Sequence, residues 1–427
     1  MRERPVGPFA LLALGVNGIV GVGIFFIPAT LGQLTPGAAG IGVFAVTGLC
    51  LVPVALVFAT LARRFDEDGG PVLFARAAFG ERVSFLVGWL AYVSAILSTS
   101  AVMSGLVTAA APGLGVSGPA ATRVALGALV TGLALVVAAG ISISAVAWTA
   151  LTVLKLLPLL GLVALFLVAG PSLWSSALAP AGSLATAAPG AAANAPAWAR
   201  AILTALFACQ GFEIVPVIAG QVRSPRRFVP FATVGSLVLS CLLYVGLMWA
   251  CVATLPGLAG ARAPLAEAGT VLGGSGFGSL IALGTSVSAL GICLGMMVTT
   301  PRYLSALAAG GRRLFDLDLF AGNGVPLRAL VVTWAFVMLI VQGGDLSQLF
   351  ALSSLAVVTQ FGVTAAALFA LALRRERDLV PRHALLAVPA FALGIYLGAQ
   401  GATRNEALAS LLALTLGFAL FAVSKPR

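Results

Sequence analysis

Long stretches without a charged residue alternate along the chain with short clusters that carry charges. Six uncharged stretches cover residues 5–62, 83–122, 124–154, 156–199, 228–261 and 268–301. A helix needs about 20 apolar residues to cross the hydrocarbon core of a bilayer, so each stretch can hold one or two membrane-spanning helices. Divided at glycine, proline and charged positions, the sequence predicts twelve helices, near 8–32, 39–62, 82–110, 121–140, 146–169, 200–222, 229–255, 276–309, 327–342, 346–373, 384–400 and 405–423.

The composition agrees with a membrane protein. Of the 427 residues, 60% are hydrophobic and 9% are charged, and the mean hydropathy is +1.09. Soluble domains carry about a quarter charged residues. The short alternating segments of a closed β-barrel are absent from the sequence. We therefore expect an all-α integral membrane protein in which residues 1–427 form a single transmembrane domain.

The placement of the charges indicates a topology. If the N-terminus lies in the cytoplasm, nineteen of the 24 lysines and arginines fall on that side, and Lys155 lies inside a predicted helix. Such an excess of positive charge is typical of cytoplasmic loops. The net charge of +11 is thus a topology signal and does not indicate nucleic-acid binding. We expect a multi-pass protein of the inner (plasma) membrane with both termini cytoplasmic. The opposite side holds Arg123, Arg200, Arg262 and Arg404.

Two predicted helices contain residues that an unbroken membrane helix avoids. The helix near 8–32 has three glycines between residues 18 and 23, and the helix near 200–222 has Gln210, Gly211 and Glu213 at a similar depth. Each is the first helix of a block of five, and paired interruptions of this kind mark the binding sites of transporters. Small-residue packing between helices is the alternative, but packing does not account for Gln210 and Glu213 inside the membrane.

The ends of interrupted helices suggest what they bind. N–H groups at the start of a half-helix favour an anion, and the carbonyl groups at the end of the preceding half suit an ammonium group. A carboxylate held by the first kind of group and an amine held by the second describe an α-amino acid. The residues predicted to bind substrate in this way are Gly18, Ile19, Val20, Gly21, Val22, Gly23, Phe207, Ala208 and Cys209.

The stretch from Gly18 to Phe25 resembles the glycine-rich first-helix motif of the amino acid–polyamine–organocation permease superfamily. The resemblance covers most of the chain. It implies a leucine-transporter-type fold with two inverted five-helix repeats, 8–169 and 200–373, followed by two extra helices, 384–423. Three further motifs carry it in order: Gly69-Gly70-Pro71 with Ala78-Phe79-Gly80 and Gly88-Trp89; Phe207 to Glu213 with Ser224-Pro225-Arg226-Arg227 and Pro230; and Arg302-Tyr303 with Ala306-Leu307-Ala308.

Two ionisable residues lie within predicted membrane helices. A charge at the position of Lys155 is costly in lipid, so the side chain should face protein or water. The resemblance implies that Lys155 replaces the cation of sodium-dependent relatives and bonds to carbonyl groups of the first helix, which predicts proton-linked transport without sodium. A structural lysine is the alternative. Glu213 is either a proton carrier or a structural acceptor of N–H bonds at the start of a half-helix.

Side chains near the breaks suggest the substrate class. We expect Gln210 to line the site and Phe207 and Met296 to contact substrate or act as gates, with ordinary packing as the alternative. Glu213 is the one acidic residue near the breaks, so a neutral, apolar amino acid is favoured.

The leading hypothesis is a proton-linked permease that works by alternating access. The alternatives are a cationic amino acid or polyamine exchanger and, from another class, a membrane nutrient sensor or enzyme. We expect no catalytic residue, metal or cofactor. The expected partners are an amino acid and the lipid bilayer, with the protein a monomer or homodimer.

Overall fold

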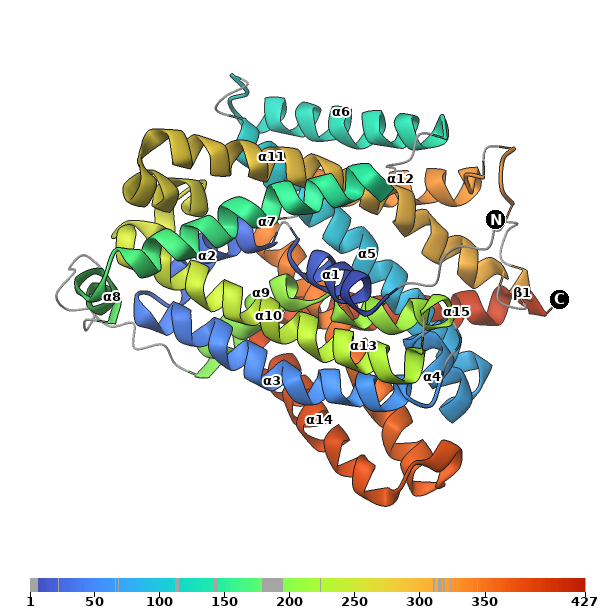
Figure 1. Cartoon of the computed structure of the whole chain (residues 1–427). Helices are drawn as coiled ribbons and strands as arrows, with labels where there is room; N and C mark the ends of the chain where they lie inside the picture. The colour runs from blue at the N-terminus through green and yellow to red at the C-terminus, as the bar shows by residue number, and fades with distance from the viewer. Residues whose placement is uncertain are drawn as a thin grey trace.

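The computed structural model describes residues 7–21, 23–65, 67, 69–111, 115–140, 145–178, 195–222, 224–309, 312–313, 317, 319–322, 324–343 and 345–426. These residues form a bundle of helices (Figure 1). In chain order the elements are α1 (Pro8–Ile19), α2 (Gly23–Leu34), α3 (Ala38–Ala62), α4 (Pro71–Phe79), α5 (Glu81–Ala110), α6 (Pro119–Ala138), α7 (Ala145–Val168), α8 (Pro171–Leu178), α9 (Ala195–Cys209), η2 (Phe212–Gln221), α10 (Pro225–Thr254), η3 (Leu258–Gly260), α11 (Pro264–Ala309), β1 (Arg312–Arg313), α12 (Leu327–Gly343), α13 (Leu346–Leu373), η4 (Glu376–Asp378), η5 (Pro381–Leu386), α14 (Ala387–Tyr396), η6 (Leu397–Gly401), α15 (Arg404–Val423) and β2 (Lys425–Pro426).

Each of the twelve predicted segments coincides with one helix or with adjoining helices. Helix α11 begins at Pro264, so the segment predicted near 276–309 coincides with its second part, and the part before it was not predicted. It includes Gly274, whose φ of 80° is not helical, so two helices join there. The short helices α4 and α8 were not predicted. With nine and eight residues, they are too short to cross a bilayer and leave little hydropathy signal.

The helices confirm an all-α membrane protein. Among the described residues, nine helices are long and apolar enough to cross a membrane, and the bent pair of α1 and α2 would make ten. Two shorter apolar helices cover Val153–Val168 and Leu327–Gly343. Large apolar side chains such as Leu49 and Leu339 lie 72% and 74% exposed on the outside of the bundle, as expected of side chains that face lipid. The total of twelve spans stays a prediction.

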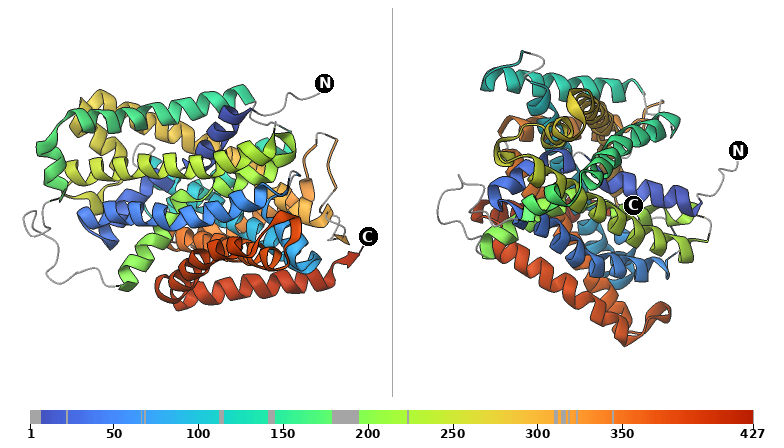
Figure 2. Two further views of the ribbon diagram at one scale, coloured as in Figure 1. Left: turned by 60° about the horizontal axis from the view of Figure 1, so that its bottom comes forward. Right: turned by 60° about the vertical axis from the view of Figure 1, so that its left-hand side comes forward.

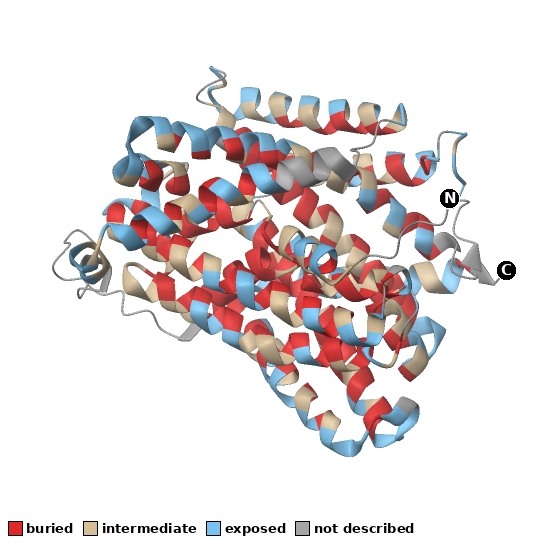
Figure 3. Ribbon diagram, viewed as in Figure 1, coloured by how far each residue is buried: buried red, intermediate tan, exposed pale blue. Residues whose placement is uncertain are grey.

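The interrupted helices lie inside the bundle. One hydrophobic core joins α1, α2, α3, α9, α10 and α13, and a second joins α5, α6, α11 and α12. Helix α10 packs along α3, and α13 packs along α5. Figure 2 shows α6 at one edge of the molecule and α14 at the opposite edge. Buried residues gather between these edges, where α1, α9 and α10 meet (Figure 3).

The last residues of the chain contact the segment that follows α11. Strand β2 pairs antiparallel with β1, and Arg313 lies opposite Lys425. The charge distribution assigns both segments to the same side of the membrane, in agreement with this pairing. That this side is the cytoplasm stays a prediction.

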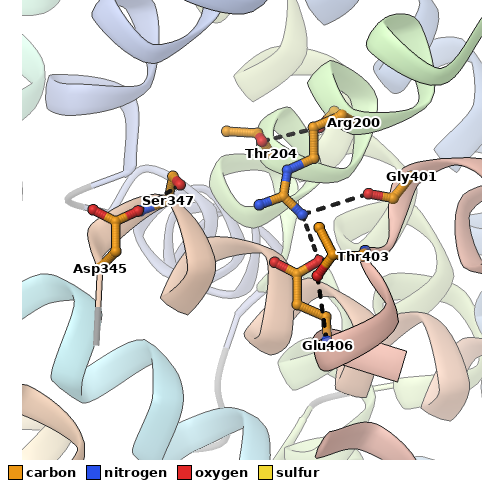
Figure 4. Close-up of polar contacts among 7 residues, drawn as sticks. All are labelled: Arg200, Thr204, Asp345, Ser347, Gly401, Thr403 and Glu406. Atoms are coloured by element: carbon orange, nitrogen blue, oxygen red, sulfur yellow. Dashed lines mark hydrogen bonds and ion pairs between the residues drawn. The ribbon is translucent and has the colours of Figure 1, made fainter. Parts of the chain in front are cut away.

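A buried ion pair fixes the start of α9 to the corner between η6 and α15 (Figure 4). Arg200 Nη1 lies 2.6 Å from Glu406 Oε2 and 3.4 Å from the carbonyl oxygen of Gly401. Glu406 is only 4% exposed, and its Oε2 also accepts a hydrogen bond from the N–H of Thr403 at 2.9 Å. The beginning of α9, the helix that ends directly before Gln210, is thus held by η6 and α15.

Candidate functional site

The first predicted helix is interrupted at its glycines. Helix α1 ends at Ile19 and α2 begins at Gly23. Val20 has φ −71° and ψ 74°, and the N–H of Gly21 donates to the carbonyl oxygen of Ile19 at 2.6 Å. These angles and this bond are those of an inverse γ-turn, which turns the chain out of the helix within one residue. Val22, one of the predicted substrate-binding residues, lies outside the described residues.

The second interruption lies between α9 and η2. Helix α9 ends at Cys209. Gly211 has φ 125° and ψ −22°, a backbone conformation that residues other than glycine rarely adopt. The N–H of Gly211 donates to Glu213 Oε2 at 2.7 Å. The Glu213 carboxylate therefore lies at the start of η2, where the helix dipole favours negative charge. This geometry fits the structural role of Glu213, and the role as a proton carrier stays a prediction.

The two interruptions pack directly against each other. A Cβ added to Gly211 would lie 2.5 Å from the carbonyl oxygen of Gly18. One added to Gly23 would lie 3.0 Å from the Cα of Ala208 and 3.1 Å from the ring of Phe207. Glycine is needed at these positions because the two backbones approach too closely for a side chain. The predicted residues of the first and sixth helices thus come together in one place.

Tyr244 of α10 joins the two interruptions. Its hydroxyl lies 2.9 Å from the carbonyl oxygen of Ile19 and 3.1 Å from that of Ala208, and the side chain is fully buried. A tyrosine has a single O–H, so it donates to one carbonyl at a time and can exchange between them. Sequence reasoning missed this residue. The one available signal was a tyrosine in the middle of an otherwise apolar helix.

Lys155 of α7 reaches the end of α1. Its ammonium donates to the carbonyl oxygen of Asn17 at 3.1 Å and to that of Val20, and the residue is 3% exposed. Helix α11 packs on the same part of α7, because a Cβ on Gly284 would lie 3.5 Å from the carbonyl oxygen of Leu154. Within the part of the chain that the structure describes, the polar partners of this buried ammonium are carbonyl groups at the end of α1, and the arrangement resembles the coordination of a bound cation.

Gln210 lies between three helices. Its Nε2 is 3.2 Å from Ser98 Oγ of α5 and 3.4 Å from Ser353 Oγ of α13. The two serine hydroxyls are 2.7 Å apart. The prediction that Gln210 belongs to the region of the breaks agrees with this position. Sequence reasoning missed both serines, although α5 carries four serines between residues 94 and 104.

The remaining predicted residues divide into two groups. The ring of Phe207 packs against that of Phe350, with the centroids 4.5 Å apart, so Phe207 closes the space between α9 and α13. Cys209 is buried with its Sγ 4.0 Å from that of Cys241. Met296 of α11 packs against the second core, which joins α5, α6, α11 and α12. Its predicted contact with substrate stays a prediction.

Comparisons with known proteins agree on one family. Residues 6–423 match the family model described as amino acid permease. An uncharacterized transporter of Mycobacterium tuberculosis is 29% identical over 413 residues, which cover 94% of this chain and 88% of that protein. The branched-chain amino acid permease of Bacillus subtilis is 26% identical over 78% of this chain and 73% of its own length. A mitochondrial cationic amino acid transporter of Arabidopsis thaliana is 25% identical over 84% of this chain and 60% of that protein.

Proposed function

The chain belongs to the amino acid permease family, and from this premise we propose that it carries neutral amino acids by proton-linked, secondary active transport around the two helix breaks. The family and the transporter relatives make the chain a multi-pass membrane transporter. One relative is named for branched-chain amino acids and another for cationic amino acids, so similarity alone does not identify the substrate of this chain.

A neutral substrate is supported by the partners of the two ionisable groups. The Glu213 carboxylate is bonded to the N–H of Gly211, and the Lys155 ammonium is bonded to carbonyl groups of α1. Through these contacts, both charged groups face the protein backbone and not the side chain of a substrate. A cationic amino acid or a polyamine would bury a charge, which is costly unless a counter-charge is present. This argument favours the neutral class over the cationic exchanger.

The position of Lys155 is the observation that carries proton coupling. Its ammonium group donates to carbonyl oxygens at the end of α1, where the family resemblance implies that sodium-dependent relatives bind a cation. Loss of the proton would remove the charge that strengthens these bonds and would release the end of α1 from α7. We infer that the protonation state of Lys155 takes the place of sodium binding, so that no sodium is needed.

Two inverted repeats would place the breaks at equivalent positions. We propose the repeats 8–169 and 200–373, followed by two extra helices at 384–423. The support is that each break lies in the first helix of its block, as expected for transporters built from repeats. Rocking of one group of helices against the other would then expose the breaks to each side of the membrane in turn.

Uptake into liposomes tests the proposed function. Purified protein would be reconstituted and offered radiolabelled neutral, cationic and acidic amino acids and a polyamine, with and without an imposed pH gradient. We expect accumulation of neutral amino acids driven by the gradient. Uptake confined to cationic amino acids or polyamines would identify the exchanger instead. Absence of uptake across the panel would contradict amino acid transport.

A further inference from the structure

The side-chain amide of Gln210 has one end engaged and one end without a partner. Its nitrogen donates to the hydroxyls of Ser98 and Ser353, and Ser94 extends this network with its Oγ 3.3 Å from Ser353 Oγ. Within the described part of the chain, the amide oxygen Oε1 is buried and has no hydrogen-bond partner. A buried acceptor without a donor is destabilising, so such a group in a native protein requires an explanation.

The side-chain amide of Gln210 and the backbone of the two helix breaks face different neighbouring helices. The backbone of α9 and of its break faces α1, where Ala208 lies against Gly23 and Gly211 lies against Gly18. The Gln210 amide instead contacts α5 and α13. An amino acid whose carboxylate and ammonium bind at the break in α1 would therefore direct its variable part towards the amide.

We propose that Gln210, with Ser98 and Ser353, selects neutral amino acids whose side chain carries a hydroxyl or a primary amide. This inference rests on the proposed function. The substrate O–H or N–H would donate to Oε1 of Gln210, and the carbonyl oxygen of a substrate amide could accept from a serine hydroxyl. Serine, threonine, asparagine and glutamine fit this description. The inference departs from the apolar side chain that the sequence favours.

Charged and apolar side chains fit the same groups less well. Gln210 and its three serines are all uncharged, so a charged side chain among them would be buried without a counter-charge. An apolar side chain would leave Oε1 unpaired. The usual cost of an unpaired buried group corresponds to a loss of about 5- to 150-fold in affinity.

Pairs of amino acids with nearly the same shape test the selectivity. Binding to the purified full-length protein would be measured calorimetrically for threonine against valine and for asparagine against leucine. We expect the polar member of each pair to bind about 5- to 150-fold more tightly. Gln210→Met keeps the length of the side chain and removes the amide, so the ratio within each pair should approach one. Ser104→Ala is the matched control, because this buried hydroxyl of α5 is also unpartnered among the described residues but lies outside the network, and the ratios should not change.

The outcomes separate this inference from the function on which it rests. Tighter binding of valine and leucine by the wild type would overturn the selectivity and leave amino acid transport intact. An equal loss of all four ligands in a folded Gln210→Met variant would show that the amide binds the shared backbone part, which also overturns it. If Gln210→Met does not fold, Ser353→Ala must lower the polar preference, and an unchanged ratio would refute the inference. Absence of binding by any amino acid would contradict the proposed function itself.

Discussion

Replacement of Gly211 by alanine should weaken substrate binding, because it forces the two helix breaks apart. The added Cβ would lie 2.5 Å from the carbonyl oxygen of Gly18 and 2.9 Å from the nitrogen of Ile19. Ordinary contacts of a Cβ begin near 3.4 Å, so the backbones must separate by about 0.9 Å. The neighbours are backbone atoms, which cannot rotate away as a side chain could.

Two effects determine how much stability and substrate affinity Gly211→Ala should lose. The φ of 125° disfavours any side chain by roughly 1–2 kcal/mol, which lowers the stability of the folded protein. The displacement acts on the site itself, and shifts of about 1 Å in binding and catalytic sites cost up to about 100-fold. We therefore expect substrate affinity to fall at least about tenfold.

The control variant Gly274→Ala separates the cost of the backbone conformation from the effect of the displacement. Gly274 also has a positive φ, 80°, but nothing lies within 4 Å of an added Cβ. The Gly274→Ala variant should therefore be less stable than the wild type but bind substrate with the same affinity. Calorimetric binding and thermal unfolding in detergent would be measured for both variants and the wild type. Wild-type affinity in Gly211→Ala, or an equal loss of affinity in Gly274→Ala, would refute the idea that contact between the breaks shapes the site.

Three further predictions concern groups around the site. Tyr244→Phe removes the hydroxyl shared by Ile19 and Ala208 and should cost about 1 kcal/mol, which calorimetry would detect as roughly fivefold weaker binding; unchanged affinity would mean that the hydroxyl does not hold the breaks. Glu406→Gln leaves Arg200 partly buried without its partner and should lower the unfolding temperature in detergent, whereas replacing both residues by methionine should restore part of the loss; a double variant no more stable than the single one would argue against this. Reporter fusions at the C-terminus should show active fluorescent protein and inactive alkaline phosphatase, because the distribution of positive charges predicts a cytoplasmic C-terminus; an active phosphatase would contradict the predicted topology.

The sequence predicts the breaks well because glycine has a direct local effect. The glycines between residues 18 and 23 lie where α1 ends and α2 begins, and Gly211 lies where α9 ends. Both positions need conformations or approaches that only glycine allows. Lys155 was equally visible, because a charge inside an apolar stretch must find partners within the protein. Its contact with the end of α1 came from the family resemblance.

The contacts between distant helices could not be predicted in the same way. Tyr244 meets Ile19 across 225 positions of sequence, and Ser98 meets Ser353 across 255. Hydropathy treats these residues as minor interruptions of apolar helices, and only the packing of α5, α10 and α13 brings them to the breaks. The first part of α11 was not predicted, because Pro264, Glu267 and the glycine pair at 273–274 interrupt the apolar pattern there.

The central claim is that the Lys155 ammonium takes the place of a sodium ion in a proton-linked transporter. Its most direct test is uptake of a bound neutral amino acid into liposomes by the wild type and by Lys155→Met, with and without an inward proton gradient and with and without sodium. We predict that the wild type accumulates substrate when the gradient is imposed and does not respond to sodium, and that Lys155→Met folds but loses the response to the gradient. Sodium-stimulated uptake by the wild type, or an unchanged response to the proton gradient in Lys155→Met, would contradict the account.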